Sequence, residues 1–289
     1  MPELPEVEVV KKSLEKEILK LTIKDVKIKD GRLRYRLKKS NFDKLIGFKI
    51  MKISRRSKYL LFFLNNDSVM IVNLGMTGKF FLVNNMKKKV KTSFYYDIPK
   101  NEKGKHDRII FKFNNKFKLI YNDVRRFGFI KIEKLNNISK NVHLKGLGPE
   151  PLDKNFNFEY FKKYLFGKNR SIKNLLMDQK FVAGLGNIYV NEILFLSKIK
   201  PLRKLENLNE INIKNLIKNT KKILKKAILM GGSSIKNFSN STGERGNFQQ
   251  KFKVYGKKGE KCSNTDCNVI VKKIIISNRS SFFCSKCQK

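Results

Sequence analysis

Four cysteines near the end of the chain constrain its fold more than any other feature of the sequence. They form two short-spaced pairs with sixteen residues between the pairs, namely Cys262 with Cys267 and Cys284 with Cys287. Close thiol pairs on either side of a hairpin-length stretch are typical of a four-cysteine zinc site, in which the protein closes off a tetrahedral ion. Two disulfides are the alternative, which a reducing cytosol disfavours. The spacing therefore predicts one structural Zn²⁺ and says nothing about catalysis.

The stretch between the pairs, VIVKKIIISNRSSFF, is typical of a β-hairpin with SNRSS at its tip. Arg279 lies in that tip, where the ribbon would hold it rigidly. An arginine presented in this way suits a phosphate group, although a solvated loop arginine is the more frequent case.

The charge of the chain is extreme. The 65 Lys and Arg residues outnumber 24 Asp and Glu, which gives a net charge of +41 and a pI near 10.1. Such a field favours a polyanionic partner, nucleic acid first and an anionic membrane surface second. Segments saturated with Lys, Asn and Ile indicate that part of the charge is compositional drift in an AT-rich genome. No apolar run suggests a membrane span or a signal peptide, so we expect a cytosolic protein.

The first half of the chain is predicted to be rich in β-strands behind an opening amphipathic helix, in which Pro5 suits a first helical position. Apolar runs with short polar turns between them predict strands at 58–64, 68–74, 108–113, 116–121 and 127–134. Because no helical pattern separates these strands, an antiparallel sheet or sandwich is favoured over a βαβ fold.

The pattern becomes helical beyond the Gly- and Pro-rich segment LKGLGPEPL, which marks a boundary. Helical segments are predicted around 172–179, at 188–199 and at 210–230, and the last ends at a Gly-Gly pair. In the turn AGLGN we expect Asn187 to be a helix N-cap. The N–H groups there form either an anion site or an ordinary interhelical turn. The polar segment 233–250 is predicted to be a mobile loop.

The second residue is the least ordinary feature of the N-terminus. Pro2 precedes the predicted helix, so helix initiation does not explain it. Removal of Met1 would expose it as a secondary amine, which is nucleophilic when unprotonated.

Several motifs in the same order resemble formamidopyrimidine-DNA glycosylases, the bacterial base-excision enzymes for oxidised purines. They are PELPEVE, RRSKYLL, NLGMTG, KHDR, YNDVRRFG, LGPEPL, DQKFVAGLGNIYVNEILF, VYGKKGEKC and the cysteine ribbon. The resemblance implies an α+β protein: an N-terminal helix with an antiparallel β-sandwich, a helix-two-turn-helix domain and a C-terminal zinc β-ribbon. The implied divisions are a catalytic domain 2–134, a linker 135–152, a helical domain 153–232, a lesion-capping loop 233–252 and a ribbon 253–289.

The resemblance also implies the chemistry. Pro2 would be the nucleophile, Glu3 the proton donor to the sugar ring oxygen, Lys58 the cationic acid of the lyase steps, and Arg279 would serve δ-elimination and hold phosphate. A helix N-terminus disfavours the ammonium form, so the pKa of the Pro2 amine should lie below about 8. The Schiff base that forms requires no organic cofactor.

The implied partner is double-stranded DNA that contains an oxidised purine or an abasic site, bound by a monomer in a bacterial cytoplasm at the nucleoid. By carry-over, His106, Arg126, Lys168 and Asn187 resemble phosphate contacts. Met76, Arg125 and Phe127 resemble side chains that fill the gap left by the everted nucleotide. Without the resemblance, Met76 and Phe127 would be assigned to the core.

This sequence departs from the family pattern at four places. Asn73 replaces the His that usually precedes LGM, Val124 stands where Pro normally precedes RRFG, and Arg108 occupies a position that is often His. The first cysteine pair has four intervening residues rather than two.

Two other functions remain open at this point. The first is an endonuclease VIII-like specificity for oxidised pyrimidines, although PELPE rather than PEGPE favours purines. The second is a non-catalytic zinc-ribbon protein that binds DNA and has no use for a free Pro2.

Overall fold

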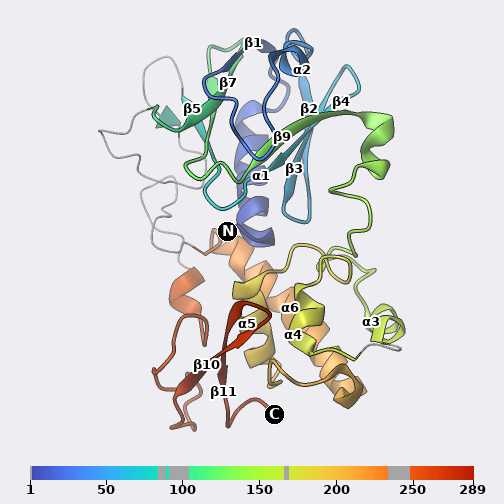
Figure 1. Ribbon diagram of the computed structural model, residues 1–289, viewed down its shortest axis with the longest axis vertical. Helices are drawn as coiled ribbons and strands as arrows, with labels where there is room; N and C mark the ends of the chain where they lie inside the picture. The colour runs from blue at the N-terminus through green and yellow to red at the C-terminus, as the bar shows by residue number, and fades with distance from the viewer. Residues whose placement is uncertain (1, 84–88, 91–103, 166–168, 234–247) are drawn as a thin grey trace. The chain divides into compact units, whose positions relative to one another are not determined.

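The computed structural model describes residues 2–83, 89–90, 104–165, 169–233 and 248–289, which form two compact units (Figure 1). The first unit takes in the described residues up to Lys145 together with residues 230–233. The second holds residues 146–229 and 248–289. No described helix is both long and apolar enough to cross a membrane.

The first unit opens with helix α1 (Leu4–Ile18), as predicted. Pro5 lies in its first turn, where a missing N–H costs no hydrogen bond. The apolar face of α1, which includes Val7, Leu14 and Ile18, is buried. The same unit contains the short helices α2 (Lys39–Asp43) and η2 (Leu135–Lys140).

Two antiparallel sheets make up the rest of this unit, and they confirm the predicted antiparallel fold. One sheet has the order β1-β7-β8-β5-β6 and the other β2-β3-β4-β9. The strands are β1 (Ile23–Ile28), β2 (Ile50–Arg56), β3 (Tyr59–Leu64), β4 (Ser68–Asn73), β5 (Lys79–Val83), β6 (Lys89–Val90), β7 (Asp107–Phe113), β8 (Lys118–Asn122) and β9 (Phe129–Lys134). Buried aromatic rings from the two sheets meet in the core. The ring centres of Phe62 on β3 and Phe80 on β5 are 5.9 Å apart.

Two connections pass between the sheets in opposite directions. Residues 74–78, called here the first crossover, lead from β4 to β5, and residues 123–128, the second crossover, lead from β8 back to β9. They touch where both are glycine. A Cβ added to Gly75 would lie 2.5 Å from the nitrogen of Gly128, so no larger residue fits there.

The second unit is helical, with a two-stranded ribbon. Its helices are α3 (Phe158–Leu165), α4 (Ile172–Met177), α5 (Asn187–Leu196), η3 (Leu205–Asn207), α6 (Glu210–Leu229) and η4 (Phe248–Lys251). Most side chains of α5 are buried, as expected of a helix that is apolar on every side. The amphipathic α6 confirms the helix predicted at 210–230. The helix η4 occupies the end of the segment predicted to be a loop at 233–250, and residues 234–247 of that segment lie outside the described residues.

The ribbon pairs β10 (Val271–Ile276) with β11 (Arg279–Cys284) and confirms the predicted hairpin. Its turn residues Ser277 and Asn278 both have positive φ, 45° and 59°, which is the two-residue turn that matches strand twist. The predicted tip was too long, because Arg279 and the two serines after it belong to β11. The base of the ribbon packs on Phe195 of α5 through a buried cluster that includes Val254 and Phe282.

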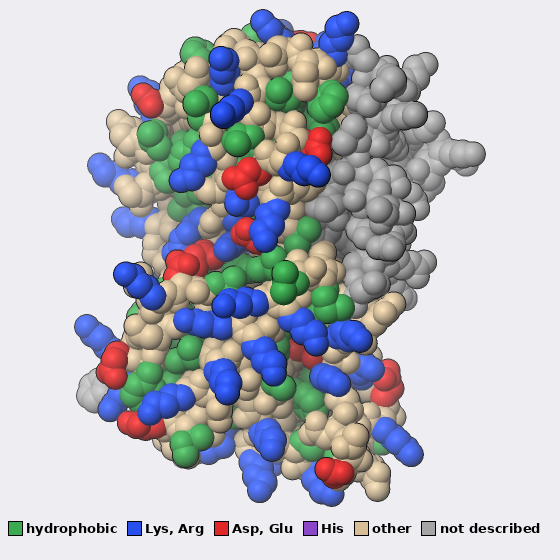
Figure 2. Space-filling view, turned by 180° about the vertical axis from the view of Figure 1, so that it is seen from behind, with side chains coloured by type: hydrophobic (Ala, Val, Ile, Leu, Met, Phe, Trp, Pro, Cys, Tyr) green, Lys and Arg blue, Asp and Glu red, His purple; other side chains and the backbone are tan. Residues whose placement is uncertain are grey.

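Positive charge is distributed widely over the surface. Lys218, Lys222 and Lys225 are exposed along α6. On the face drawn in Figure 2, Lys and Arg side chains are scattered across the surface rather than gathered in one patch. This distribution agrees with the interpretation that part of the charge is solvated and has no specific partner.

Candidate active site and nucleic-acid interface

The N-terminus of α1 is held in place by buried carboxylates. Pro2 and Glu3 are buried, and Glu3 is the N-cap of α1. The Glu3 N–H donates to Oε2 of Glu6 at 2.8 Å, while Oε1 of Glu6 accepts hydrogen bonds from the backbone N–H and the hydroxyl of Ser233 at 2.8 and 2.9 Å. The Glu6 carboxylate thus links the start of α1 to Ser233, the residue that follows the Gly-Gly pair.

A small cavity lies beside Pro2. Its volume is about 30 Å³, and its lining includes Pro2, Lys58, Asn73 and Gly75. Water needs at least about 10 Å³, so the cavity has room for a water molecule but not for a substrate. The structure therefore brings together Pro2 and Lys58, two of the four residues to which the sequence assigned catalysis.

Asn73 links two sides of this cavity. Its amide Nδ2 donates to the carbonyl of Lys58 at 3.4 Å, and its Oδ1 accepts from the N–H of Gly75 at 3.0 Å. An asparagine can donate and accept at once, so it connects the Lys58 backbone to the first crossover. This departure from the family pattern therefore has a defined structural role.

The two crossovers carry the exposed side chains to which a gap-filling role was assigned. Met76 is 39% exposed on the first and Phe127 is 43% exposed on the second. The guanidinium of Arg125 lies 4.6 Å from the centre of the Phe127 ring, within the range of a cation–π contact. The hydroxyl of Thr77 accepts from the Arg125 N–H at 3.0 Å, which ties the two crossovers together.

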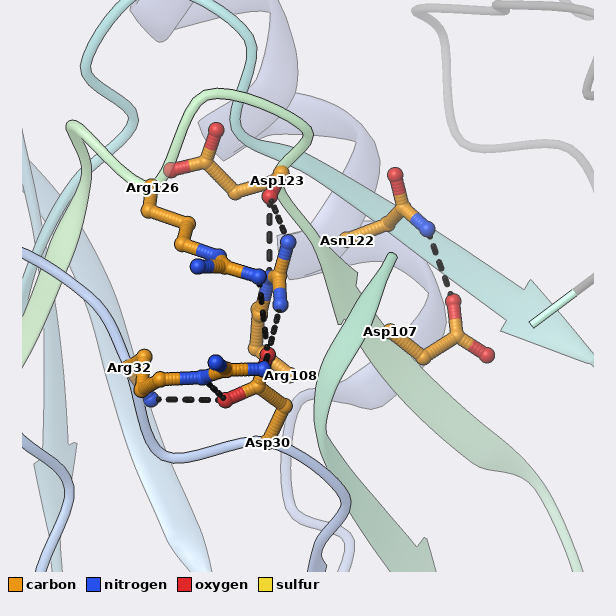
Figure 3. Close-up of polar contacts among 7 residues, drawn as sticks. All are labelled: Asp30, Arg32, Asp107, Arg108, Asn122, Asp123 and Arg126. Atoms are coloured by element: carbon orange, nitrogen blue, oxygen red, sulfur yellow. Dashed lines mark hydrogen bonds and ion pairs between the residues drawn. The ribbon is translucent and has the colours of Figure 1, made fainter. Parts of the chain in front are cut away.

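The second crossover rests on a polar network that sequence reasoning missed (Figure 3). Arg108 is only 1% exposed, and its guanidinium contacts both the backbone carbonyl of Asp123 and the carboxylate of Asp30. Hydrogen bonds from Arg32 and the charge of Arg108 hold the pKa of Asp30 well below its usual range. Arg126 belongs to the same group, with Nη2 3.5 Å from the Asp30 carboxylate. The net charge of +41 is a sum over the whole chain, so it does not indicate that Arg108 in particular is buried.

His106 joins this network through its backbone. Its carbonyl accepts from the Asp123 N–H at 3.0 Å, immediately before β7 begins. The exposed Arg126 and the half-exposed His106, both assigned to phosphate contacts, thus flank one fixed residue of the second crossover.

In the second unit the start of β11 is attached to α4 and α5. Asn187 Nδ2 donates to the Ser280 carbonyl at 2.9 Å, and Lys173 Nζ lies 3.2 Å from the same carbonyl and 2.5 Å from the Ser281 hydroxyl. Burial, and then the charge of Arg279, lowers the pKa of Lys173 to about 8. Arg279 itself is exposed at the start of β11.

The N-cap prediction for Asn187 is wrong. Gly186, in an extended conformation, is the N-cap of α5, and Asn187 is the first residue of the helix. The Asn187 side chain instead reaches a carbonyl 93 positions away in the chain, a partner that local sequence rules do not reveal.

Glu192 is a second buried polar residue that the sequence did not indicate. Its carboxylate accepts from the N–H groups of Lys253, Val254 and Tyr255 at 2.8 to 3.0 Å. These contacts fasten the segment that leads into the ribbon onto α5. Burial raises the pKa of Glu192 although the three N–H donors oppose that shift.

The four cysteines are free thiols and lie close enough together to hold a metal ion. Their sulfur atoms all lie within 4.8 Å of one another. The Sγ atoms of Cys262 and Cys287 are 3.8 Å apart, and those of Cys267 and Cys284 are 3.6 Å apart. These separations exceed a disulfide bond of about 2 Å. Lys168, assigned to a phosphate contact, lies outside the described residues.

Comparisons with known proteins agree along the whole chain. The family model for the formamidopyrimidine-DNA glycosylase N-terminal domain matches residues 1–130, and that for the formamidopyrimidine-DNA glycosylase H2TH domain matches residues 147–239. Formamidopyrimidine-DNA glycosylases from Rickettsia bellii (strain OSU 85-389) and Zymomonas mobilis are 41% and 40% identical over 289 residues, with 100% of each chain covered.

Solved structures give the same result. The Lactococcus lactis Fpg in complex with DNA that contains an abasic site has a TM-score of 0.86 and 37% identity, with 99% of both chains covered. Its complex with DNA that contains Fapy-dG has a TM-score of 0.85 and 37% identity, with 99% of this chain and 100% of that chain covered.

Proposed function

The chain belongs to the formamidopyrimidine-DNA glycosylase family, and on that premise we propose how its own residues act. The protein is a DNA glycosylase that excises oxidised purines from duplex DNA and also cleaves the strand at abasic sites. Its place of action is the bacterial cytoplasm, at the nucleoid.

The nucleophile is the secondary amine of Pro2, exposed when Met1 is removed. The amine nitrogen attacks C1′ of the damaged nucleotide, the glycosidic bond breaks, and the base leaves with the bonding electrons and takes up the proton that the amine loses. Glu3 supplies the proton that the ring oxygen takes as the sugar opens. The product is an iminium that joins the enzyme to the sugar, so one difficult displacement becomes a series of easier steps.

Strand cleavage follows from the acidity of the iminium. Loss of the C2′ proton expels the 3′ phosphate by β-elimination, and a second elimination expels the 5′ phosphate. Lys58 serves as the cationic acid of these steps, and Arg279 supports δ-elimination while it holds a phosphate. Hydrolysis of the remaining iminium returns the free amine.

The observation that carries this proposal is the shared cavity of Pro2 and Lys58 at the start of α1. A cation that lines the same small cavity as a nucleophilic amine disfavours a second positive charge there, and this favours the neutral amine that attack on C1′ requires. A structural proline at a helix start would need neither a lysine nor a cavity.

Side chains of two kinds hold the DNA. His106, Arg126, Lys168 and Asn187 contact phosphates. Met76, Arg125 and Phe127 fill the gap that the everted nucleotide leaves, because apolar and planar side chains offset the loss of stacking.

The metal site holds one Zn²⁺. Four thiolates about 2.3 Å from a tetrahedral zinc have sulfur atoms about 3.8 Å apart. Two of the sulfur separations, 3.6 and 3.8 Å, match that value, and all of them are within 4.8 Å. The ion would stabilise the base of the ribbon and therefore the position of Arg279.

Borohydride trapping tests the proposal. Sodium borohydride added to the protein with a duplex that contains 8-oxoguanine should reduce the iminium and give a covalent adduct at Pro2, located by peptide mapping. Pro2→Gly should retain some reaction through its primary amine. An adduct that forms equally well on protein with Met1 still attached would refute the mechanism. A parallel duplex with thymine glycol reports on specificity for pyrimidines.

A further inference from the structure

A buried arginine supports the second crossover. Arg108 on β7 is 1% exposed, and its Nε and Nη2 both donate to the carbonyl oxygen of Asp123, at 2.9 and 2.7 Å (Figure 3). Its Nη1 is bonded to the carboxylate of Asp30. A buried cation is stable only when its donors are satisfied, and this pattern of donors requires the flat fork of a guanidinium.

The residue held by Arg108 is the one that fixes the rest of the crossover. The carboxylate of Asp123 accepts from the Thr77 hydroxyl at 2.5 Å and from the Gly128 N–H at 2.8 Å. The same hydroxyl accepts from the Arg125 N–H. A rotation of the peptide group after Asp123 would therefore move both ends of the 123–128 segment.

The middle of the segment has little support of its own. Val124, Arg125, Arg126 and Phe127 are all exposed, so burial does not fix them. Arg126 has φ of 63°, a left-handed conformation that a residue with a Cβ adopts only when its surroundings impose it. The shape of the segment therefore depends on polar contacts, namely those of Asp123 and Gly128 at its ends and the bond from the Arg125 N–H to Thr77.

Asp30 extends the same support to Arg126. Its carboxylate contacts Arg108 and lies 3.5 Å from Nη2 of Arg126, and Arg32 closes the group with Nε at 2.9 Å. Three guanidinium groups around one carboxylate leave a net charge of about +2. Arg126 is thus oriented in advance and keeps donors for a phosphate.

We propose that Arg108 is a positioning residue for DNA recognition: through the Asp123 carbonyl it holds the second crossover in the shape that places Arg125, Arg126 and Phe127 against DNA. This role rests on the proposed function of those three side chains. Arg108 touches neither the DNA nor the reacting atoms, so its loss should impair recognition and leave the chemistry at Pro2 intact.

The test uses Arg108→Gln and Arg108→Lys, with Arg203→Gln as the matched control. Arg203 also donates through Nε and Nη2 to one backbone carbonyl, that of Asn207, but it belongs to the second unit, whereas the crossover belongs to the first. Each variant is assayed for single-turnover excision of 8-oxoguanine opposite cytosine and opposite adenine, for Kd on a lesion duplex, and for cleavage of a preformed abasic site at saturating protein. Urea unfolding gives the folded fraction.

The guanidinium of Arg125 carries only hydrogen-bond donors, so it should favour an opposite cytosine, which offers the O2 and N3 acceptors, over adenine. Both Arg108 variants should therefore raise Kd about tenfold and lower the cytosine-over-adenine excision ratio about tenfold. For both Arg108 variants, the rate of cleavage of the preformed abasic site at saturating protein should stay within about twofold of the wild-type rate. The control Arg203→Gln should match the wild type in all three assays. Adding Val124→Pro to Arg108→Gln should recover part of the ratio, because the ring fixes φ directly after Asp123.

The inference would be overturned if Arg108→Gln is folded and has the Kd and the cytosine-over-adenine excision ratio of the wild type. A uniform loss of all three activities in proportion to the unfolded fraction would also overturn it, because that is the result of a purely structural role. If the Arg108 variants do not fold, Asp30→Asn decides, because it removes the charge that holds the Arg108 guanidinium against the Asp123 carbonyl and that orients Arg126. An unchanged Kd together with an unchanged cytosine-over-adenine ratio for this variant refutes the inference. Failure of the wild type to excise at all would instead refute the proposed function.

Discussion

Lys173 offers a quantitative test of the electrostatics beneath the ribbon turn. Its amine is buried against Ser280 and Ser281, and burial together with the charge of Arg279 lowers its pKa from 10.5 to about 8. In the unfolded chain the pKa returns to its ordinary value. Between these two pKa values the unfolded state holds a proton that the folded state has lost.

That difference in proton binding fixes the sign of the pH dependence. Because the unfolded state binds more protons, the free energy of unfolding rises with pH between about 8 and about 10.5. A shift of about 2.5 pKa units corresponds to about 3 kcal/mol over the whole window. From pH 7 to pH 9.5 the titration supplies about 2 kcal/mol of this, and residual solvation of the amine reduces the expected change to about 1 to 2 kcal/mol.

Lys173→Met isolates the effect, since methionine keeps the apolar stem and removes the titrating group. The free energy of unfolding is measured by urea unfolding with zinc bound, followed by circular dichroism. From pH 7 to pH 9.5 it should rise by about 1 to 2 kcal/mol more for the wild type than for the variant. Lys222→Met, which replaces an exposed lysine on α6, should show the same pH dependence of the free energy of unfolding as the wild type. If the wild type and Lys173→Met show the same pH dependence of the free energy of unfolding, the Lys173 amine is not desolvated and the reasoning fails.

Three further predictions concern the proposed site. Glu3→Gln should abolish base excision but leave cleavage of a preformed abasic site largely intact, because that site already offers its aldehyde; loss of both activities would make Glu3 merely structural. Cys284→Ser should lose zinc and bind DNA more weakly, and metal analysis that finds no zinc in active wild type would contradict the assignment. Arg126→Ala should flatten the log–log salt dependence of DNA binding by about one unit. Lys222→Ala should leave that slope unchanged, and equal slopes for both variants would place Arg126 outside the interface.

The sequence predicted those parts of the fold that depend on local pattern. The apolar run at 68–74 corresponds to β4 and the alternation at 108–113 to β7, and the cysteine spacing predicted a thiol cluster that the structure contains. A period of two residues or a pair of close thiols is visible within a few positions. The Gly-Gly pair likewise marked the end of α6.

The parts that could not be predicted depend on distant partners. Arg108 is buried because Asp30, 78 positions away, pairs with it, and no rule of spacing reveals such a pair. Asn187 satisfies the usual preference for an N-cap, but a bond to Ser280 competes with capping and Gly186 takes that place. Both failures concern polar side chains whose conformation is decided by tertiary hydrogen bonds rather than by local propensity.

The contrast between arginine and lysine separates functional charge from composition. Only 12 of the 65 basic residues are arginine, and several of these make contacts that depend on a planar fork. Arg108 and Arg203 each donate twice to one carbonyl, and Arg55 bridges Glu8 and the carbonyl of Ser57. Lysine offers one point charge and cannot reproduce these patterns. An Arg108→Lys exchange would keep the net charge at +41 yet remove the support of the second crossover, so the geometry of a few cations matters more for recognition than their total number.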